Sequence, residues 1–319
     1  MPQPTQSSVH VDTPLTNYSL AYIQDANRFI SQQVFPRINV MKQSDKYFTY
    51  TKADWFRDEA GRRADGTESV GSGYNLSSAT YSCDVWAFHK DVGEQVRANS
   101  DVPLRPELDA TQFVTQVLLQ RQEAQWMTDF FGTSIWANDV TPTNLWSNQT
   151  ASDPVGDIQT GITTILQNTG QMANTLVLGY QVFVQLKQHP DLIDRMKYSS
   201  MPTDRTLTPS LMAEVFGVDR VLVSSAIKNT AVEGATGSYS FHAGKHALLC
   251  HSPASAGLLT PMAAATFVWT PISDGMGASI GISRLDMPHL RATRIEGQVA
   301  FDNKVIATDL GYFFNGAVA

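Results

Sequence analysis

Charged side chains are concentrated in one short segment near the beginning of the chain. From Asp45 to Glu68, 11 of 24 residues are charged, or 46%, against 17% for the whole sequence. Gly71-Ser72-Gly73 follows, and then an alternating run from Thr80 to His89, in which every second residue faces one side. The pattern predicts a long two-stranded excursion with a flexible tip. Such an excursion does not fit a compact globule, and it suggests assembly with partners outside the chain. The residues that share one side of the run are Tyr81, Cys83, Val85 and Ala87.

The strongest helix signal comes next along the chain. Asp109 suits the N-cap, Gln112 follows three residues later, and Gly132 is a terminator. A helix from Ala110 to Phe131 would be about 33 Å long at about 1.5 Å per residue. A helix of this length usually serves as a backbone for other elements. The apolar residues at helical spacing are Phe113, Val114, Val117, Leu118, Ala124, Met127 and Phe131.

From Asp153 onward, helices and short strands alternate. Asp153-Pro154 begins a predicted helix that Gly170 ends, and Pro209 begins another that Gly217 ends. Segment 230–244 is predicted to be a surface loop, and the chain ends in a predicted hairpin around Asp302-Asn303. This alternation indicates an α/β region, and for the whole chain we expect an α+β fold. The other predicted elements are helices at 181–188 and 191–197, strands at 175–178, 220–224 and 246–250, and hairpin strands at 295–301 and 304–307.

The composition excludes several classes of protein. The chain has 319 residues, 42% of them hydrophobic, and no apolar run approaches the roughly 18 residues of a membrane span. The polar start, residues 1–10, lacks the features of a signal peptide, and two distant cysteines cannot form a disulfide framework. The net charge is −7, and no Lys or Arg lies between Arg121 and Lys187. We therefore expect any nucleic acid to be contained rather than gripped.

Three pairs of short sequence segments are similar to segments of a known protein family. They are NTLVLG at 174–179 with QHPDLIDRMK at 188–197, RVLV at 220–223 with NTA at 229–231, and KVIA at 304–307 with GYFF at 311–314. With the order of the predicted elements, they resemble the major capsid proteins of tailed bacteriophages, which have the Hong Kong 97-type fold. The resemblance covers nearly the whole chain.

The resemblance implies both a domain organisation and a function. The function is self-assembly into the pentamers and hexamers of an icosahedral shell that encloses double-stranded viral DNA, with no catalysis and no cofactor. In this family an extended loop reaches over a neighbouring subunit. The implied division is an N-terminal arm (1–44), an extended loop (45–90), a peripheral domain (91–154) with a spine helix (110–131), an axial domain (155–270) and return strands of the peripheral domain (271–319).

The main partner implied by the resemblance is a further copy of the chain. Only about 40 residues precede the extended loop, so a separate scaffolding protein is expected, together with a portal. Decoration proteins are a further class of partner, no membrane is involved, and the DNA is enclosed without sequence-specific binding. The expected location is the virion capsid, assembled in the bacterial cytoplasm. Lys46 and Lys52 lie in the loop, but nothing supports covalent cross-linking of subunits.

The charge-dense loop is the expected contact with neighbouring subunits. A single exposed ion pair contributes roughly 0–1 kcal/mol, but a closed lattice repeats each contact many times. Mixed charges also set the register of two surfaces, and guanidinium groups pair bidentately with carboxylates. The alternative is a solvated, mobile loop, with its aromatic residues packed beneath it. The candidate contact residues are Trp55, Phe56, Arg57, Asp58, Glu59, Arg62, Arg63, Asp65 and Glu68.

Two other functions stay open at this point. The first is an encapsulin-like nanocompartment shell, which shares the fold but encloses a cargo enzyme. The second is a soluble metal-dependent hydrolase that uses His242, His246 and His251, with Cys250 nearby. If 246–251 is a strand, His246 and His251 point to opposite faces, which weighs against a metal site. His189, before Pro190, is interpreted as helix punctuation rather than as an acid-base group.

Overall fold

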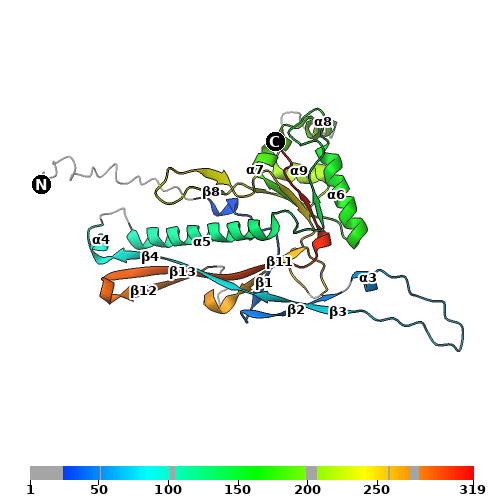
Figure 1. Ribbon diagram of the computed structural model, residues 1–319, viewed down its shortest axis with the longest axis horizontal. Coiled ribbons are helices and arrows are strands. Elements are labelled where there is room, and N and C mark those ends of the chain that lie inside the picture. Colours follow the sequence, from blue (N-terminus) through cyan, green and yellow to red (C-terminus); the bar gives the residue numbers. More distant parts are fainter. Residues whose placement is uncertain (1–23, 51, 101–104, 199–206, 258, 274–279) are drawn as a thin grey trace.

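The computed structural model describes residues 24–50, 52–100, 105–198, 207–257, 259–273 and 280–319. Two five-stranded sheets organise this part of the chain (Figure 1). One sheet lies under a single long helix, and we call it the peripheral sheet. The other is surrounded by shorter helices, and we call it the axial sheet. A two-stranded hairpin projects away from both (Figure 1).

The peripheral sheet is built around one long central strand. Its strands are β1 (Arg37–Val40), β4 (Asp84–Gly93), β11 (Ala264–Trp269), β12 (Gly281–Met287) and β13 (Ala292–Val305). Strand β13 pairs antiparallel with β4 along one edge and with β11 and β12 along the other, while β1 pairs parallel with β11. The arm residues of β1 therefore complete the sheet of their own subunit.

Helix α5 (Pro106–Phe130) packs closely along one face of the peripheral sheet (Figure 1). A β carbon at Gly297 of β13 would lie 2.6 Å from Val114 Cγ1 and 2.7 Å from Leu118 Cδ1. Only a residue without a side chain permits this approach. Val114 and Leu118 are both buried, so the predicted apolar stripe meets the sheet at this point.

The predicted limits and stripe of this helix are partly wrong. The helix begins at Pro106 instead of Ala110, because proline is favourable in a first turn and Glu107 and Asp109 suit its positive end. Asp109 is thus not the N-cap. The buried stripe includes Trp126 and Phe130, which the prediction left out, whereas Phe113 is 51% exposed.

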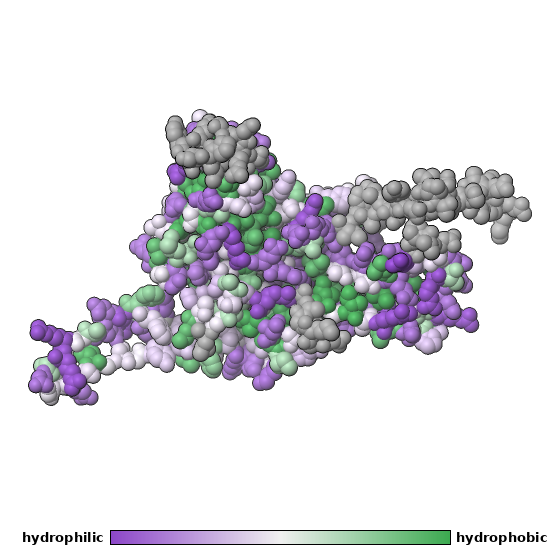
Figure 2. Space-filling view, turned by 180° about the vertical axis from the view of Figure 1, so that it is seen from behind, coloured by the Kyte–Doolittle hydropathy of each residue, from purple (hydrophilic) through white to green (hydrophobic). Residues whose placement is uncertain are grey.

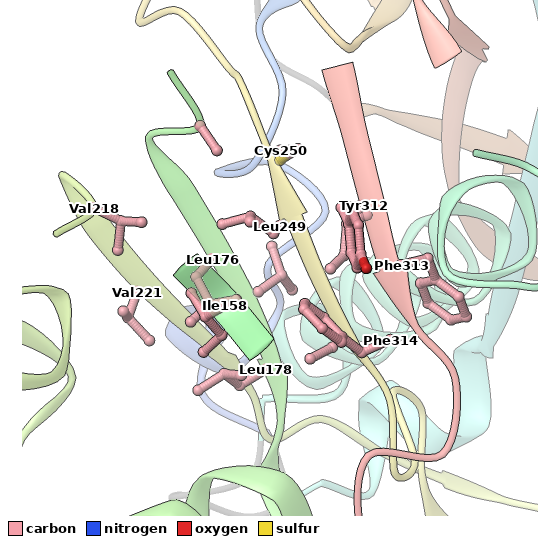
Figure 3. Packing of buried hydrophobic residues seen from close by; sticks show 14 of the residues in the cluster. Ile158, Leu176, Leu178, Val218, Val221, Leu249, Cys250, Tyr312, Phe313 and Phe314 are labelled. Atoms are coloured by element: carbon pink, nitrogen blue, oxygen red, sulfur yellow. The ribbon is translucent and has the colours of Figure 1, made fainter. Parts of the chain in front are cut away.

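The axial sheet has the strand order β5-β14-β10-β6-β7. Its strands are β5 (Asn138–Val140), β6 (Thr175–Gly179), β7 (Arg220–Ser224), β10 (Ala247–Cys250) and β14 (Gly311–Phe314). The surrounding helices are α6 (Pro154–Thr169), α7 (Tyr180–Lys187), α8 (Pro190–Tyr198) and α9 (Pro209–Phe216). Figure 3 shows the buried core here, with Ile158 of α6 beside Leu176 and Leu178 of β6, and Leu249 and Phe314 on the neighbouring strands.

Local signals correctly predicted the helix ends of the axial region. The side chain of Asp153 accepts a hydrogen bond from the backbone N–H of Gly156 at 2.8 Å and so caps α6. Gly170 and Gly217 end α6 and α9 in the left-handed conformation, with φ of 68° and 72°. A side chain at either position would strain the backbone.

The projecting hairpin is formed by β2 (Ser44–Tyr50) and β3 (Leu76–Ser82), with the short helix α3 (Lys52–Trp55) after the first strand. Its root is fixed to the peripheral sheet, because the ring of Tyr81 stacks on that of Phe267 with centroids 4.5 Å apart. The excursion is shorter than the predicted 45–90. It ends at Ser82, since Cys83 is buried and β4 already pairs with β13.

Three strands also lie in a different sheet from the one that the expected domain boundaries imply. Strand β11 lies in the peripheral sheet although 155–270 was expected to be axial, and β14 lies in the axial sheet although 271–319 was expected to be peripheral. Strand β5, within the expected peripheral range 91–154, also joins the axial sheet. The predicted terminal hairpin is wrong, because β13 runs straight through Asp302-Asn303, whose partners in β11 are Phe267 and Thr266.

Several short elements complete the described chain. Strands β8 (Ile227–Asn229) and β9 (Tyr239–Phe241) form a small hairpin, within a segment predicted to be partly loop. The remaining ones are α4 (Glu94–Ala98) and the 3₁₀ turns η1 (Ala26–Arg28), η2 (Thr270–Ser273), η3 (Pro288–Leu290) and η4 (Thr308–Leu310). In the described segments, no helix is both long enough and apolar enough to cross a membrane.

Candidate inter-subunit surface

The neck of the extended loop is an aromatic cluster. We define the neck as Tyr50, α3, Phe56 and Tyr74. The rings of Tyr50, Trp55 and Tyr74 lie with centroids 5.8 to 6.0 Å apart. Trp55, predicted to be an inter-subunit contact, therefore joins the two sides of its own loop, although its side chain remains 55% exposed. This arrangement agrees with the alternative that the loop's aromatic residues pack beneath it.

The other predicted aromatic contact, Phe56, touches its own axial region. A β carbon at Gly170 would lie 3.2 Å from Phe56 Cε1 and 3.3 Å from Phe56 Cζ. Phe56 is nevertheless 65% exposed, so most of the ring is available to another molecule. One edge of the ring is thus used within the subunit.

Beyond the neck lies the charged tip, which we define as residues 57–73. Figure 2 shows that its surface is mostly hydrophilic. Arg57 pairs with Glu59 at 3.1 Å, and Arg63 Nε donates to the carbonyl oxygen of Thr67 at 2.6 Å. Hydrogen bonds from Ser72 and then Arg57 lower the pKa of Glu59. Arg57, Glu59 and Arg63, three of the predicted contact residues, therefore already have hydrogen-bond or ion-pair partners within the tip.

The tip carries four further charged residues. All of them are exposed, and none forms an ion pair with another residue in the described part of the chain. Unpaired charges at the end of a projecting hairpin are well placed to meet a complementary surface on a neighbouring molecule. These residues are Asp58, Arg62, Asp65 and Glu68.

The arm is held by a buried carboxyl group on α5. Glu123 is 0% exposed, and it accepts hydrogen bonds from the backbone N–H of Ser31 at 2.9 Å and from Ser224 Oγ at 3.3 Å. Burial raises the pKa of Glu123, although these hydrogen bonds oppose the shift. One carboxyl group thereby joins the arm, the spine helix and the end of β7.

Arg220 of β7 holds the next part of the arm. Its guanidinium group donates to the carbonyl oxygens of Gln33 at 3.0 Å and Val34 at 2.9 Å, while Nε donates to Thr175 Oγ1 at 2.9 Å. The flanking arm residues Phe29, Ile30, Val34 and Phe35 are buried. The described arm is therefore an integral part of its own subunit from residue 29 onward.

Sequence reasoning identified neither Glu123 nor Arg220 as an anchor. A signal for Glu123 was present, because it continues the stripe of Val114 and Leu118 toward Trp126, where an acidic residue is unusual. Arg220 had no comparable signal, since its acceptors in the arm are backbone carbonyl groups more than 180 residues away.

The histidines considered as metal ligands have separate surroundings. His246 stacks on Phe313 at 5.5 Å, and its Nδ1 accepts from the backbone N–H of Gly316 at 3.0 Å. His251 Nδ1 lies 2.7 Å from the carbonyl oxygen of Met172, and burial raises the pKa of Cys250 to about 12. Within the described ranges, no group of three or more His, Cys, Asp or Glu side chains is arranged to hold a metal ion.

His189 lies between Ser152 and Asp191, an order that is also found in the catalytic triad of serine hydrolases. Its two ring nitrogens, however, have the opposite donor and acceptor roles. The backbone N–H of Asp191 donates to His189 Nδ1, so the hydrogen lies on Nε2, 3.0 Å from Ser152 Oγ. Ser152 in turn donates to the carbonyl oxygen of Asn148. A catalytic histidine must instead accept the serine proton. His189 caps α8, as the helix-punctuation interpretation predicted.

Two known phage proteins resemble the chain in sequence. The major capsid protein of Burkholderia phage BcepMu is 28% identical over 225 residues, which is 68% of this chain and 69% of the relative. The major capsid protein of Pseudomonas phage JBD67 is 26% identical over 314 residues, 97% of each chain. No family model matches the sequence.

Solved structures show the same fold at lower sequence identity. A phage-related protein from Bordetella bronchiseptica has a TM-score of 0.68 and 19% identity, with 96% of this chain and 97% of that chain covered. The capsid structure of cyanophage P-SCSP1u has a TM-score of 0.63 and 11% identity, with 98% and 94% covered. A Synechococcus elongatus encapsulin has a TM-score of 0.57 and 10% identity, with 97% and 96% covered.

The two sheets, the long helix and the projecting hairpin thus define the Hong Kong 97-type fold. Encapsulins share that fold, but the sequence relatives are phage capsid proteins. The chain is thus similar in sequence and in fold to phage major capsid proteins, and this similarity indicates a structural rather than an enzymatic role.

Proposed function

We propose that copies of this chain form pentamers and hexamers that close into an icosahedral shell around double-stranded DNA. The projecting hairpin is the observation that carries the proposal. Its tip bears Asp58, Arg62, Asp65 and Glu68, whose charges have no ion-pair partner in the described part of the subunit. Repeated weak contacts of this kind add up in a closed lattice and stay reversible during assembly.

The charge of the chain supports enclosure of DNA without tight binding. The net charge is −7, and residues 122–186 contain no lysine or arginine. Proteins that grip DNA do so mainly by neutralising phosphates with basic side chains. An acidic shell instead leaves packaged DNA unattached to the wall.

We infer the domain roles from the same architecture. The peripheral sheet with α5, the axial sheet with its helices, and the hairpin correspond to the peripheral domain, the axial domain and the extended loop of this family. In this proposal the tip contacts a neighbouring copy, through the candidate residues from Arg57 to Glu68. Trp55 contributes mainly by shaping the loop, because its ring packs against Tyr50 and Tyr74.

Three further partners belong to the proposal: a separate scaffolding protein, a portal and decoration proteins. We also propose that assembly takes place in the bacterial cytoplasm. Co-expression of the chain with candidate scaffold and portal proteins tests these partners. Shells of uniform size that appear only with a scaffold would support a separate scaffold, and uniform shells from the chain alone would contradict it.

The contents of native particles test the function itself. Purified particles are examined by electron microscopy, and nucleic acid and protein are then extracted from them. We expect closed shells that contain double-stranded DNA. Shells that contain a protein cargo and no DNA would contradict the proposal and would favour the encapsulin alternative.

A further inference from the structure

The neck of the extended loop makes an ion pair with the 3₁₀ turn η4, which precedes β14 of the axial sheet. Lys52 of α3 binds the carboxylate of Asp309, which lies in η4 directly before β14 of the axial sheet. The two residues are 257 positions apart in the chain, so this contact depends on the folded arrangement. Their side chains are 47% and 37% exposed, which makes the contact reversible.

A second contact of the neck lies on a different element. The ring edge of Phe56 rests on Gly170, which ends α6 in the left-handed conformation. A β carbon there would lie 3.2 Å from the ring, closer than most such contacts, so glycine serves both the turn and the contact. Two contacts at separate points resist rotation of the neck better than one does.

Internal contacts link the two sides of the neck into one rigid unit. The rings of Tyr50, Trp55 and Tyr74 join its two sides. The carboxylate of Asp54 also accepts hydrogen bonds from the backbone N–H of Asn75 at 2.9 Å and from its side-chain amide at 3.1 Å. The direction of the neck therefore determines where the tip points.

We propose that this neck is a dock that fixes the direction of the extended loop before assembly. Lys52, Phe56, Gly170 and Asp309 are then positioning residues: they need not touch the neighbouring copy, but they present the charged tip to it. The orienting role follows from contacts within one subunit. Its consequence for assembly rests on the proposed function.

Charge reversal of the ion pair tests the dock. The variants are K52D, D309K and the double exchange K52D/D309K, with F56S as an independent variant. Spin labels at A64C in the tip and T163C on α6 report the direction of the loop in the unassembled subunit. Cys83 and Cys250 are buried, and burial raises their pKa values to about 11 and about 12, so labelling favours the introduced thiols. K42D/D45K is the matched control, because Lys42 and Asp45 form an exposed pair with each other at the root of the hairpin.

We expect one narrow distance distribution in the unexchanged protein and in the control. The single reversals should lower the ratio of docked to undocked loops by up to about fivefold, the most that one exposed ion pair supplies. The double exchange should restore the narrow distribution and the yield of shells. F56S should broaden the distribution without any change of charge.

Two results would overturn the inference. One is an unchanged distance distribution in both K52D and F56S. The other is a broadened distribution with shells of normal yield and size, since the dock would then have no part in assembly. A docked loop in a protein that never forms shells would instead contradict the proposed function and leave the orienting role intact.

Discussion

Glu123 joins three parts of the molecule through a single buried carboxyl group. Burial raises its pKa above the ordinary value of 4.5, so the folded state holds this proton more tightly than the unfolded chain does. The stabilisation that results is fully present below the ordinary pKa and is lost as the pH rises through the raised one. Charge on this residue is therefore unfavourable for the folded subunit near neutral pH.

The pH dependence of stability tests this assignment. We expect the free energy of unfolding of E123Q, relative to the unsubstituted protein, to increase as the pH rises from about 4.5 and then to level off. Urea unfolding of the unassembled subunit at several pH values measures it. E214Q, at an exposed position of α9, is the control. A difference for E123Q that stays flat or falls with pH would contradict the assignment.

Arg220 anchors the arm through backbone carbonyl groups. Hydrogen bonds from a charged donor are worth about 1.5–3 kcal/mol, so R220A should lower the free energy of unfolding by about that amount. The arm should also become more accessible, and trypsin should cleave after Arg28 several times faster. R195A, at an exposed position of α8, should have neither effect. An unchanged cleavage rate in R220A would refute the anchoring role.

At the scale of elements, the approach of α5 to the peripheral sheet depends on Gly297. A valine there would clash with Val114 and Leu118, and overpacking of this kind costs about 1–3 kcal/mol. We expect G297V to lose that much stability in denaturant unfolding. G73V is the control, because nothing lies within 4 Å of a β carbon at that position in the tip. Equal stabilities of the two variants would show that the helix is not held at this contact.

Element prediction succeeded where the signals were local. The cap at Asp153 and the stops at Gly170 and Gly217 depend on residues within a few positions, and all three were predicted correctly. The prediction of a turn at Asp302-Asn303 was wrong, because these side chains form hydrogen bonds with residues distant in the sequence. Asp302 accepts from the backbone N–H of Ser82, and the amide of Asn303 donates to Asp129. Residue types typical of turns are therefore compatible with a strand when tertiary contacts satisfy them.

The extended loop shows a similar limit. Its charge density and alternation correctly indicated a two-stranded excursion, but the alternation continues through Cys83 into β4, which belongs to another sheet. Periodicity alone does not reveal a change of sheet. The anchors Glu123 and Arg220 and the neck contact at Asp309 join residues from 92 to 257 positions apart, so no local sequence pattern identifies their partners.

On the scale of the whole molecule, the chain combines a well-packed body with a hairpin whose tip makes few contacts within its own subunit. The body contains the peripheral and axial sheets, and the arm is built into it by β1, Glu123 and Arg220. Among the described residues, the hairpin and its charged tip extend beyond the body, with the charges of the tip exposed (Figures 1 and 2). We therefore expect folding to depend on the body and, in the proposed function, assembly to depend on the tip.

Deletion of the tip tests that division most directly. Residues 57–73 are replaced by a short Gly-Ser linker, which leaves the neck and stem in place. The variant and the full chain are then compared by electron microscopy and by size-exclusion chromatography with light scattering. We predict that the variant is folded and soluble, as single subunits or capsomers, but closes no shells. Closed shells of normal size and yield from the variant would contradict the account.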